Sequence, residues 1–151
     1  MPTLNIYFAC SITGGRQDEH IYQQIVAALQ AQGYHIPTAG LASPEVLQLE
    51  GEAEPTTVYE RDTTWIRECD VLIAEVSTPS HGVGYEIAYA LQHAKPVICL
   101  YRAGTPISKM LLGNRDPRLR VFSYNDRSEA INTLLQHLEE ITLQQQGQPS
   151  R

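Results

Sequence analysis

One stretch organises this chain: the apolar run Val71-Leu72-Ile73-Ala74, then Thr78-Pro79-Ser80-His81-Gly82-Val83-Gly84-Tyr85-Glu86, then Ile87-Ala88-Tyr89-Ala90-Leu91. The first run is typical of a buried strand and the last of a helix, while Pro79 and the two glycines predict a turn between them. Free N–H groups at a helix start can hold an anion, and the helix dipole favours an ionised Glu86 in the first turn. The stretch therefore predicts a phosphate-binding turn beside a carboxylate, or else a plain strand-to-helix turn whose Glu86 only complements the dipole.

Further strand and helix patterns lie on both sides of this stretch. Strands are predicted at residues 4–10, 34–36, 71–76, 97–101 and 119–122. Helices are predicted from about Ile21 to a stop at Gly33, from Thr56 or Thr57 to about Cys69, from Ile87 onward, and around residues 130–141. This alternation predicts an α/β fold, a three-layer α/β/α sandwich with a five-stranded parallel sheet of the Rossmann or flavodoxin-like kind. Ligands bind at the carboxyl ends of such strands, where Ser11 and Ser80 both fall.

Size and composition predict a single domain. The chain has 151 residues, of which 42% are hydrophobic, and we place the domain at residues 1–143. Residues 144–151 are polar and low in complexity, so we expect a disordered tail.

The charge of the chain limits its partners. A formal charge of −6 argues against a nucleic-acid polymer or an anionic membrane, although a locally positive pocket can still take a single nucleotide. No apolar run approaches the length of a membrane span. The three cysteines are far apart and form no C-x-x-C, which favours a reduced, cytoplasmic protein without a zinc knuckle.

Standard nucleotide-binding fingerprints are missing. There is no G-x-x-x-x-G-K-[ST], and Gly82-Val83-Gly84 lacks the third glycine of a dinucleotide-binding loop. A phosphate-accepting receiver domain would carry an acidic cluster after the first strand, where this chain has Cys10 and Ser11. We expect neither a metal nor another cofactor.

Asp62 is the second clue to a functional site. It lies four residues after Val58 and four before Ile66, on the apolar stripe of the predicted helix. Because an aspartate is rarely buried without a partner, Asp62 either has a functional partner inside or lies at the rim of the stripe, reaching water or an arginine. The acidic, loop-like stretch 38–55 before this helix is long for a connection, and it is a lid, a mobile flap or a solvated insertion without a role.

Three sets of motifs occur in order along the chain. They are Ile6-Tyr7-Phe8-Ala9-Cys10-Ser11-Ile12 with Gly14-Gly15-Arg16, then Tyr59-Glu60-Arg61-Asp62 with Trp65, then Ala74-Glu75-Val76 through Gly82-Val83-Gly84-Tyr85-Glu86. Together they resemble the 2′-deoxynucleoside 5′-monophosphate N-hydrolases, which are relatives of the nucleoside 2-deoxyribosyltransferases. The similarity runs from about Leu4 to Leu138. It implies hydrolysis of the N-glycosidic bond of a nucleoside 5′-monophosphate, releasing a free base and a sugar 5-phosphate.

The resemblance also implies a role for individual residues. Glu86 is the nucleophile at the anomeric carbon, Tyr7 orients it, and Asp62 contacts the sugar or helps to protonate the departing base. Ser108 matches a serine that the family supplies from the neighbouring subunit, which implies a homodimer. The 5′-phosphate site is implied at Ser11, Ile12, Thr13, Gly14, Arg16, Ser80 and Gly82.

Elementary chemistry requires groups of the same kind. Cleavage of a glycosidic bond passes through an oxocarbenium-like state, which an anionic carboxylate stabilises or captures as a covalent adduct. The leaving base needs a proton, and an acid on an apolar helix face can have a raised pKa. Phosphate binding supplies energy away from the reacting bond and positions the sugar.

Some positions depart from the family pattern. Thr13 stands where an arginine is common, so Arg16 is expected to meet that phosphate charge. His81 stands where an apolar residue is usual, and it either touches the phosphate or faces solvent. Residues 38–40 lack a histidine that some relatives carry near the base, so the sequence assigns no base preference. A nucleoside 2-deoxyribosyltransferase and a non-catalytic nucleotide sensor stay open as alternatives, and Cys10 is an alternative nucleophile without a histidine placed to activate it.

Overall fold

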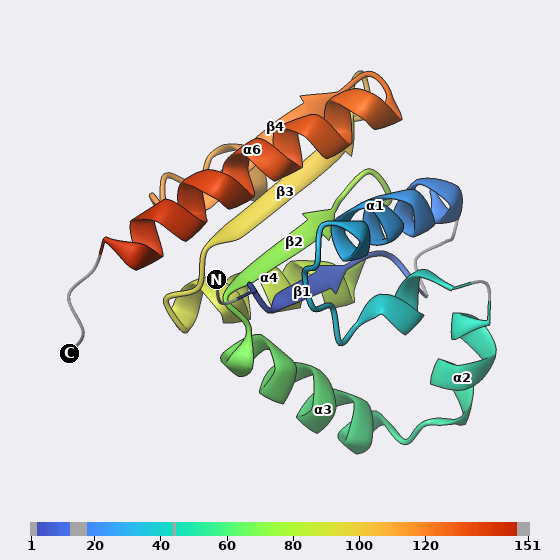
Figure 1. The fold of residues 1–151 in the computed structure, drawn as a ribbon. Helices are drawn as coiled ribbons and strands as arrows, with labels where there is room; N and C mark the ends of the chain where they lie inside the picture. Colours follow the sequence, from blue (N-terminus) through green and yellow to red (C-terminus); the bar gives the residue numbers. More distant parts are fainter. Residues whose placement is uncertain (1–2, 13–17, 44, 148–151) are drawn as a thin grey trace.

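In the residues that the computed structural model describes (3–12, 18–43 and 45–147), four parallel strands form one sheet in the order β1-β2-β3-β4 (Figure 1). The strands are β1 (Ile6–Ala9), β2 (Val71–Glu75), β3 (Val97–Arg102) and β4 (Leu119–Tyr124). The helices are α1 (Glu19–Ala31), the 3-10 helix η1 (Ala39–Ala42), α2 (Val46–Glu52), α3 (Pro55–Glu68), α4 (His81–Gln92), α5 (Lys109–Leu112) and α6 (Arg127–Gln146). The predicted α/β fold with a parallel sheet is confirmed, with four strands where five were expected.

Each face of the sheet has its own apolar core, because neighbouring residues of a strand point to opposite faces. Ile6 and Phe8 of β1 pack with α1 and α6 on one face, whereas Tyr7 and Ala9 pack with α3 and α4 on the other. Figure 1 shows α1 and α6 along the same face of the sheet, and the two helices are in contact. Tyr7 therefore points into the layer formed by α3 and α4.

Residues 34–36 form a single bridge rather than the predicted strand. His35 of this stretch pairs in parallel with Asn5, the residue before β1. The ladder ends there because Pro37 has no N–H to donate. The Phe8 N–H donates instead to Oγ1 of Thr38, at 2.8 Å.

The acidic stretch 38–55 contains η1 and α2, so the prediction of a loop without secondary structure is wrong. Helix α3 follows it and begins at Pro55, with Glu54 as its N-cap residue, rather than at Thr56 or Thr57. Proline suits the first helical position because the N–H that it lacks would have no acceptor there.

Helix α6 is longer than predicted. It continues to Gln146, so residues 144–146 of the expected disordered tail are helical, whereas residues 148–151 lie outside the described part of the chain. Glutamine is a good helix former and lets the helix run on past its last buried residue, Ile141. None of the described helices, α6 included, is long and apolar enough to cross a membrane.

A buried hydrogen-bond network fastens the carboxyl end of the sheet on the face covered by α1 and α6. Glu75, at the end of β2, is fully buried. It accepts from the Ser77 N–H at 2.6 Å and from the hydroxyl of Tyr124 in β4. Asp18 is also buried and accepts from the Thr78 hydroxyl at 2.9 Å. The network thus fixes the start of the segment that leads from β2 to α4.

Replacing Tyr124 by Phe should lower the free energy of unfolding by about 1–3 kcal/mol, because it removes a donor from the buried Glu75 carboxyl. Urea unfolding measures the change. The matched control is Tyr101→Phe in the neighbouring strand β3, since the Tyr101 hydroxyl makes no hydrogen bond to the residues that the structure describes. The control should change stability by less than about 0.5 kcal/mol, and equal losses in the two variants would contradict the role given to Tyr124.

Candidate active site

Tyr7, Asp62 and Glu86 come from three different elements and meet in the layer between the sheet and the helices. Tyr7 lies on β1, Asp62 on α3 and Glu86 on α4. The pKa of the Tyr7 hydroxyl is raised well above its ordinary value, by burial first and then by the negative charges of Glu86 and Asp62. The structure therefore brings together the three residues that the sequence singled out for catalysis.

Of the two carboxyl groups at the site, that of Glu86 has the more strongly raised pKa. Its pKa is raised from 4.5 to about 7, and burial is the largest cause. The charge of Asp62 contributes to this rise, while the Tyr7 hydroxyl and the charge of Arg61 oppose it. Near neutral pH Glu86 is therefore divided between its ionised and protonated forms.

The Tyr7 hydroxyl acts on both carboxyl groups without a fully formed hydrogen bond to either. It lowers the pKa of Glu86 and of Asp62 as a hydrogen-bond donor does. Among the residues described, however, no acceptor meets this buried hydroxyl at full hydrogen-bond distance and angle. The interaction is thus weaker than a short hydrogen bond, and it leaves the hydroxyl close to both acids.

Asp62 lies at the rim of the apolar stripe of α3, where its side chain is 18% exposed. Burial is the first cause of a pKa above the ordinary value, and a hydrogen bond from Arg61 is the first cause that lowers it. The Nε–H of Arg61 donates to Oδ1 of Asp62 at 2.8 Å. Asp62 therefore has both partners that the sequence left as alternatives: an arginine at the rim, and Tyr7 and Glu86 within.

The start of α4 differs from the predicted turn. The helix begins directly after Ser80, so Gly82 and Gly84 lie inside it and Glu86 is the sixth residue of the element spanning His81–Gln92. The helix dipole acts mainly within the first turn, so the prediction that it favours an ionised Glu86 is wrong. The helix starts early because Ser80 is a good N-cap, whose Oγ accepts from the Val83 N–H at 3.3 Å.

Gly82 keeps open the space between the Glu86 carboxyl and the Ser80 hydroxyl. A methyl group at residue 82 would lie 3.7 Å from Oε1 of Glu86 and 3.9 Å from Oγ of Ser80. The first N–H groups of a helix have no acceptor within it. The start of α4 therefore offers a seat for an anion beside Glu86.

The strand side of the predicted phosphate site is described only in part. Ser11 is fully buried just after β1, and Ile12 is half-buried and packs against the core beside α1. Because β1 and β2 are adjacent and parallel, Ser11 lies at the same edge of the sheet as the segment that leads to α4. Thr13, Gly14 and Arg16 lie outside the described residues.

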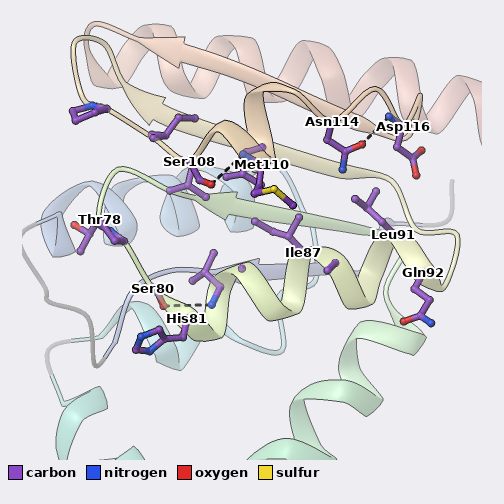
Figure 2. Close-up of a pocket in the computed structure, with 18 residues that line it drawn as sticks. Thr78, Ser80, His81, Ile87, Leu91, Gln92, Ser108, Met110, Asn114 and Asp116 are labelled. Atoms are coloured by element: carbon purple, nitrogen blue, oxygen red, sulfur yellow. Dashed lines mark hydrogen bonds between the residues drawn. The ribbon is translucent and has the colours of Figure 1, made fainter.

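A groove of about 950 Å³ runs along α4, between this helix and the connection from β3 to β4 (Figure 2). Ser80 and the exposed His81 lie at one end of it, and Ser108 lies on the opposite wall. The Ser108 hydroxyl caps α5 and accepts from the Met110 N–H at 3.1 Å. Much of the lining is apolar, including Ile87, Leu91, Met110 and Leu111. The three residues predicted for catalysis do not line this groove, which adjoins the site only at the start of α4.

Within residues 3–12, 18–43 and 45–147, the remaining metal-binding and nucleophilic side chains form no second centre. Among the residues described, no three His, Cys, Asp or Glu side chains converge as metal ligands. The cysteines are buried. Burial raises the pKa of the Cys69 thiol to about 11 and that of Cys99 to about 12, so both are weak nucleophiles at neutral pH.

Two charged residues at the site were missed by reasoning from the sequence. Arg61 pairs with Asp62 and also donates to Glu50 of α2, at 2.8 Å. The contact of Arg61 could have been predicted, because this arginine is next to an aspartate on an apolar stripe. The contact of Glu50 could not be predicted in this way, because α2 was expected to be a loop.

Comparison with known proteins gives consistent findings. The sequence pattern of the family described as nucleoside 2-deoxyribosyltransferase matches residues 6–149. A 5-hydroxymethyl-dUMP N-hydrolase from Mus musculus is 38% identical over 147 residues, covering 93% of this chain and 83% of the relative. A protein of the same name from Danio rerio is 39% identical over 144 residues, covering 92% of this chain and 99% of the relative.

A solved structure shares the fold. The CMP N-glycosidase of Clostridium botulinum superposes with a TM-score of 0.68 over 88% of this chain and 99% of its own. Only 19% of residues are identical, so this similarity shows a shared fold and nothing further.

Replacing Glu86 by Gln should stabilise the ligand-free fold at alkaline pH. The folded pKa of about 7 exceeds the ordinary value of 4.5, so between these values the folded state binds more protons than the unfolded state, and stability falls as the pH rises. Gln carries no charge, so above pH 7 the variant should melt several degrees higher. The difference should vanish below pH 4.5.

Thermal unfolding over this pH range measures the effect. The control is Glu60→Gln on α3, where the side chain is exposed, and its melting temperature should follow that of the unchanged protein. A gain for Glu86→Gln that is the same at every pH would contradict the desolvation of Glu86.

Proposed function

We propose that this chain, which belongs to the nucleoside 2-deoxyribosyltransferase family, hydrolyses the N-glycosidic bond of a (2′-deoxy)nucleoside 5′-monophosphate. The products are the free base and (deoxy)ribose 5-phosphate. The observation that carries the proposal is a half-buried carboxyl group, that of Glu86, beside Tyr7 and Asp62 and next to the open start of a helix. The names of the two hydrolase relatives support the same reaction class.

Glu86 acts as the nucleophile. One carboxylate oxygen bonds to the anomeric carbon as the bond from that carbon to the base breaks. The base takes up the proton that its nitrogen needs, and Asp62, whose pKa is raised by burial, is the acid that helps to supply it. Water then attacks the anomeric carbon and gives a proton back to Asp62 as the bond to Glu86 breaks, which releases the sugar phosphate and restores both carboxyl groups. Tyr7 orients Glu86 for the attack.

The 5′-phosphate is bound at the start of α4 and at the end of β1. Ser80 and the N–H of Gly82 hold it on one side, and Ser11 and Ile12 on the other; the family pattern adds Thr13, Gly14 and Arg16. Binding through backbone N–H groups and hydroxyls suits a protein whose formal charge is −6, because it needs few cations. The phosphate holds the sugar so that its anomeric carbon faces Glu86.

The active form is a homodimer in which Ser108 of each subunit completes the phosphate site of the other. The groove beside α4 supports this arrangement, because its apolar lining ends at Ser80 and His81. Met110 on its wall is 83% exposed, so the groove presents apolar surface that a second subunit would cover. A cytoplasmic location accords with the buried cysteines.

Incubation with a panel of ribo- and deoxynucleoside 5′-monophosphates, 5-hydroxymethyl-dUMP among them, should release free base, whereas unphosphorylated nucleosides should react much more slowly. Chromatography of the released bases measures this. Glu86→Gln should lower kcat by roughly 10³-fold or more, because it removes the nucleophile. Full activity in Glu86→Gln would exclude Glu86 from that role.

The same assay separates the alternatives. Adding a second base to the unphosphorylated nucleosides and finding a new nucleoside would assign a transferase, for which no phosphate site is required. Tight nucleotide binding by calorimetry without turnover of any panel member would assign a sensor.

Mixing two impaired variants tests the exchange of Ser108 between subunits. Ser108→Ala should raise KM about tenfold by removing one hydrogen bond to a charged phosphate. In a mixed dimer of Ser108→Ala with Glu86→Gln, one site has Glu86 from the first chain and Ser108 from the second. That site should regain the KM of the unchanged enzyme. If no mixing ratio gives a population of sites with this KM, Ser108 does not contribute to the partner's site.

A further inference from the structure

Arg61 links the Asp62 carboxyl to helix α2. Its Nε donates to Oδ1 of Asp62 and its Nη2 to Oε1 of Glu50, each at 2.8 Å. Its guanidinium carbon also lies 5.1 Å from the centre of the Trp65 ring, within the range of cation–π attraction. Contacts to three side chains on two helices hold Arg61 against Asp62.

These charges are only partly exposed to water. The exposed fraction is 15% for the Glu50 side chain and 31% for that of Arg61. Exposed ion pairs contribute little because water screens them, whereas partly buried charges are screened less. The titratable groups that face Asp62 are Arg61 on its own helix, Glu50 from α2, Tyr7 from β1 and Glu86 from α4.

We propose that Arg61, held in place by Glu50, is a positioning residue that keeps Asp62 oriented toward Tyr7 and holds a positive charge near the Glu86 carboxylate. The inference deepens the proposed function and rests on it. Without Arg61, the carboxyl groups of Asp62 and Glu86 would lie beside the Tyr7 hydroxyl, and none of the groups named above would carry a positive charge. Like charges in such a site cannot all remain ionised, so one of the acids would take up a proton.

The directions in which the pKa values move agree with this role. Arg61 lowers the pKa of both Asp62 and Glu86, and Glu50 raises the pKa of both. Glu86 attacks only when ionised, so Arg61 extends activity to lower pH and Glu50 restricts it. The two partners of one ion pair should therefore move one pH profile in opposite directions.

The test is the pH dependence of kcat/KM on a deoxynucleoside 5′-monophosphate. In Arg61→Gln, the acidic limb should move to higher pH, and a limb displaced by one pH unit lowers kcat/KM about tenfold at a given acidic pH. In Glu50→Gln, the side chain can still accept from Arg61 but carries no charge, so the limb should move to lower pH. In Arg61→Lys, the charge remains, so the limb should return toward its original position, with a lower kcat because the fork geometry is lost.

Arg67→Gln is the matched control. Arg67 lies on the same helix and donates to the Tyr89 hydroxyl at 2.6 Å, away from Asp62. It should leave the profile unchanged. The proposal would be overturned if the pH profiles of Arg61→Gln and Glu50→Gln moved in the same direction or superimposed on that of the unchanged protein. A purely structural ion pair would change the melting temperature without displacing the two profiles in opposite directions.

A second readout keeps this test independent of turnover. Carboxyl-carbon NMR titration of the ligand-free protein should show the Glu86 midpoint rising in Arg61→Gln and falling in Glu50→Gln. If the unchanged protein releases no base, the proposed function fails while the midpoints still decide the role of Arg61. Unmoved midpoints in a protein that hydrolyses nucleotides would refute only the role of Arg61.

Discussion

The site depends on the desolvation of one carboxyl group. Glu86 is withdrawn from water far enough to raise its pKa to about 7, so its charge must be supported by what surrounds it. Tyr7 and Arg61 support the ionised form, whereas Asp62 and Glu50 oppose it. These groups come from β1, α2, α3 and α4. The ionisation of one residue thus depends on the packing of four elements, because this candidate nucleophile lies between the layers of the domain rather than on a surface loop.

The central strands could be predicted from the sequence because each is a short, continuous apolar segment, as expected for a strand that is covered on both faces of the sheet. The errors lie at the periphery, where partners distant in the sequence decide the structure. Residues 34–36 fail to form a strand because Pro37 cannot donate and Thr38 takes the Phe8 N–H. Helix α2 lies in an acidic stretch without a clear apolar period, and its Glu50 is paired with Arg61 eleven positions further on. Local patterns carry no information about such contacts.

The candidate site, like the fold, was predicted in part from the sequence. The motifs around Tyr7, Asp62 and Glu86 identified a family that the comparison confirms, and the structure groups these residues. The two glycines were misread, because glycine usually marks a turn, whereas Gly82 and Gly84 lie in α4. Gly82 leaves space within the helix, because a side chain at this position would occupy the gap between Glu86 and Ser80. A sequence shows that a side chain is missing, but only the fold shows what that leaves room for.

Glu75 and Glu86 show why a raised pKa alone does not identify a catalytic carboxyl group. Burial is the largest cause of the raised pKa in both. Glu75 accepts from the Tyr124 hydroxyl and from the N–H and hydroxyl of Ser77, so the protein itself occupies both of its oxygens. Glu86 makes no fully formed hydrogen bond with Tyr7, and its Oε1 faces the space beside Gly82. A nucleophile must keep one oxygen uncommitted until the substrate arrives. Of these two buried acids, the one that the protein leaves less satisfied is therefore the one suited to react.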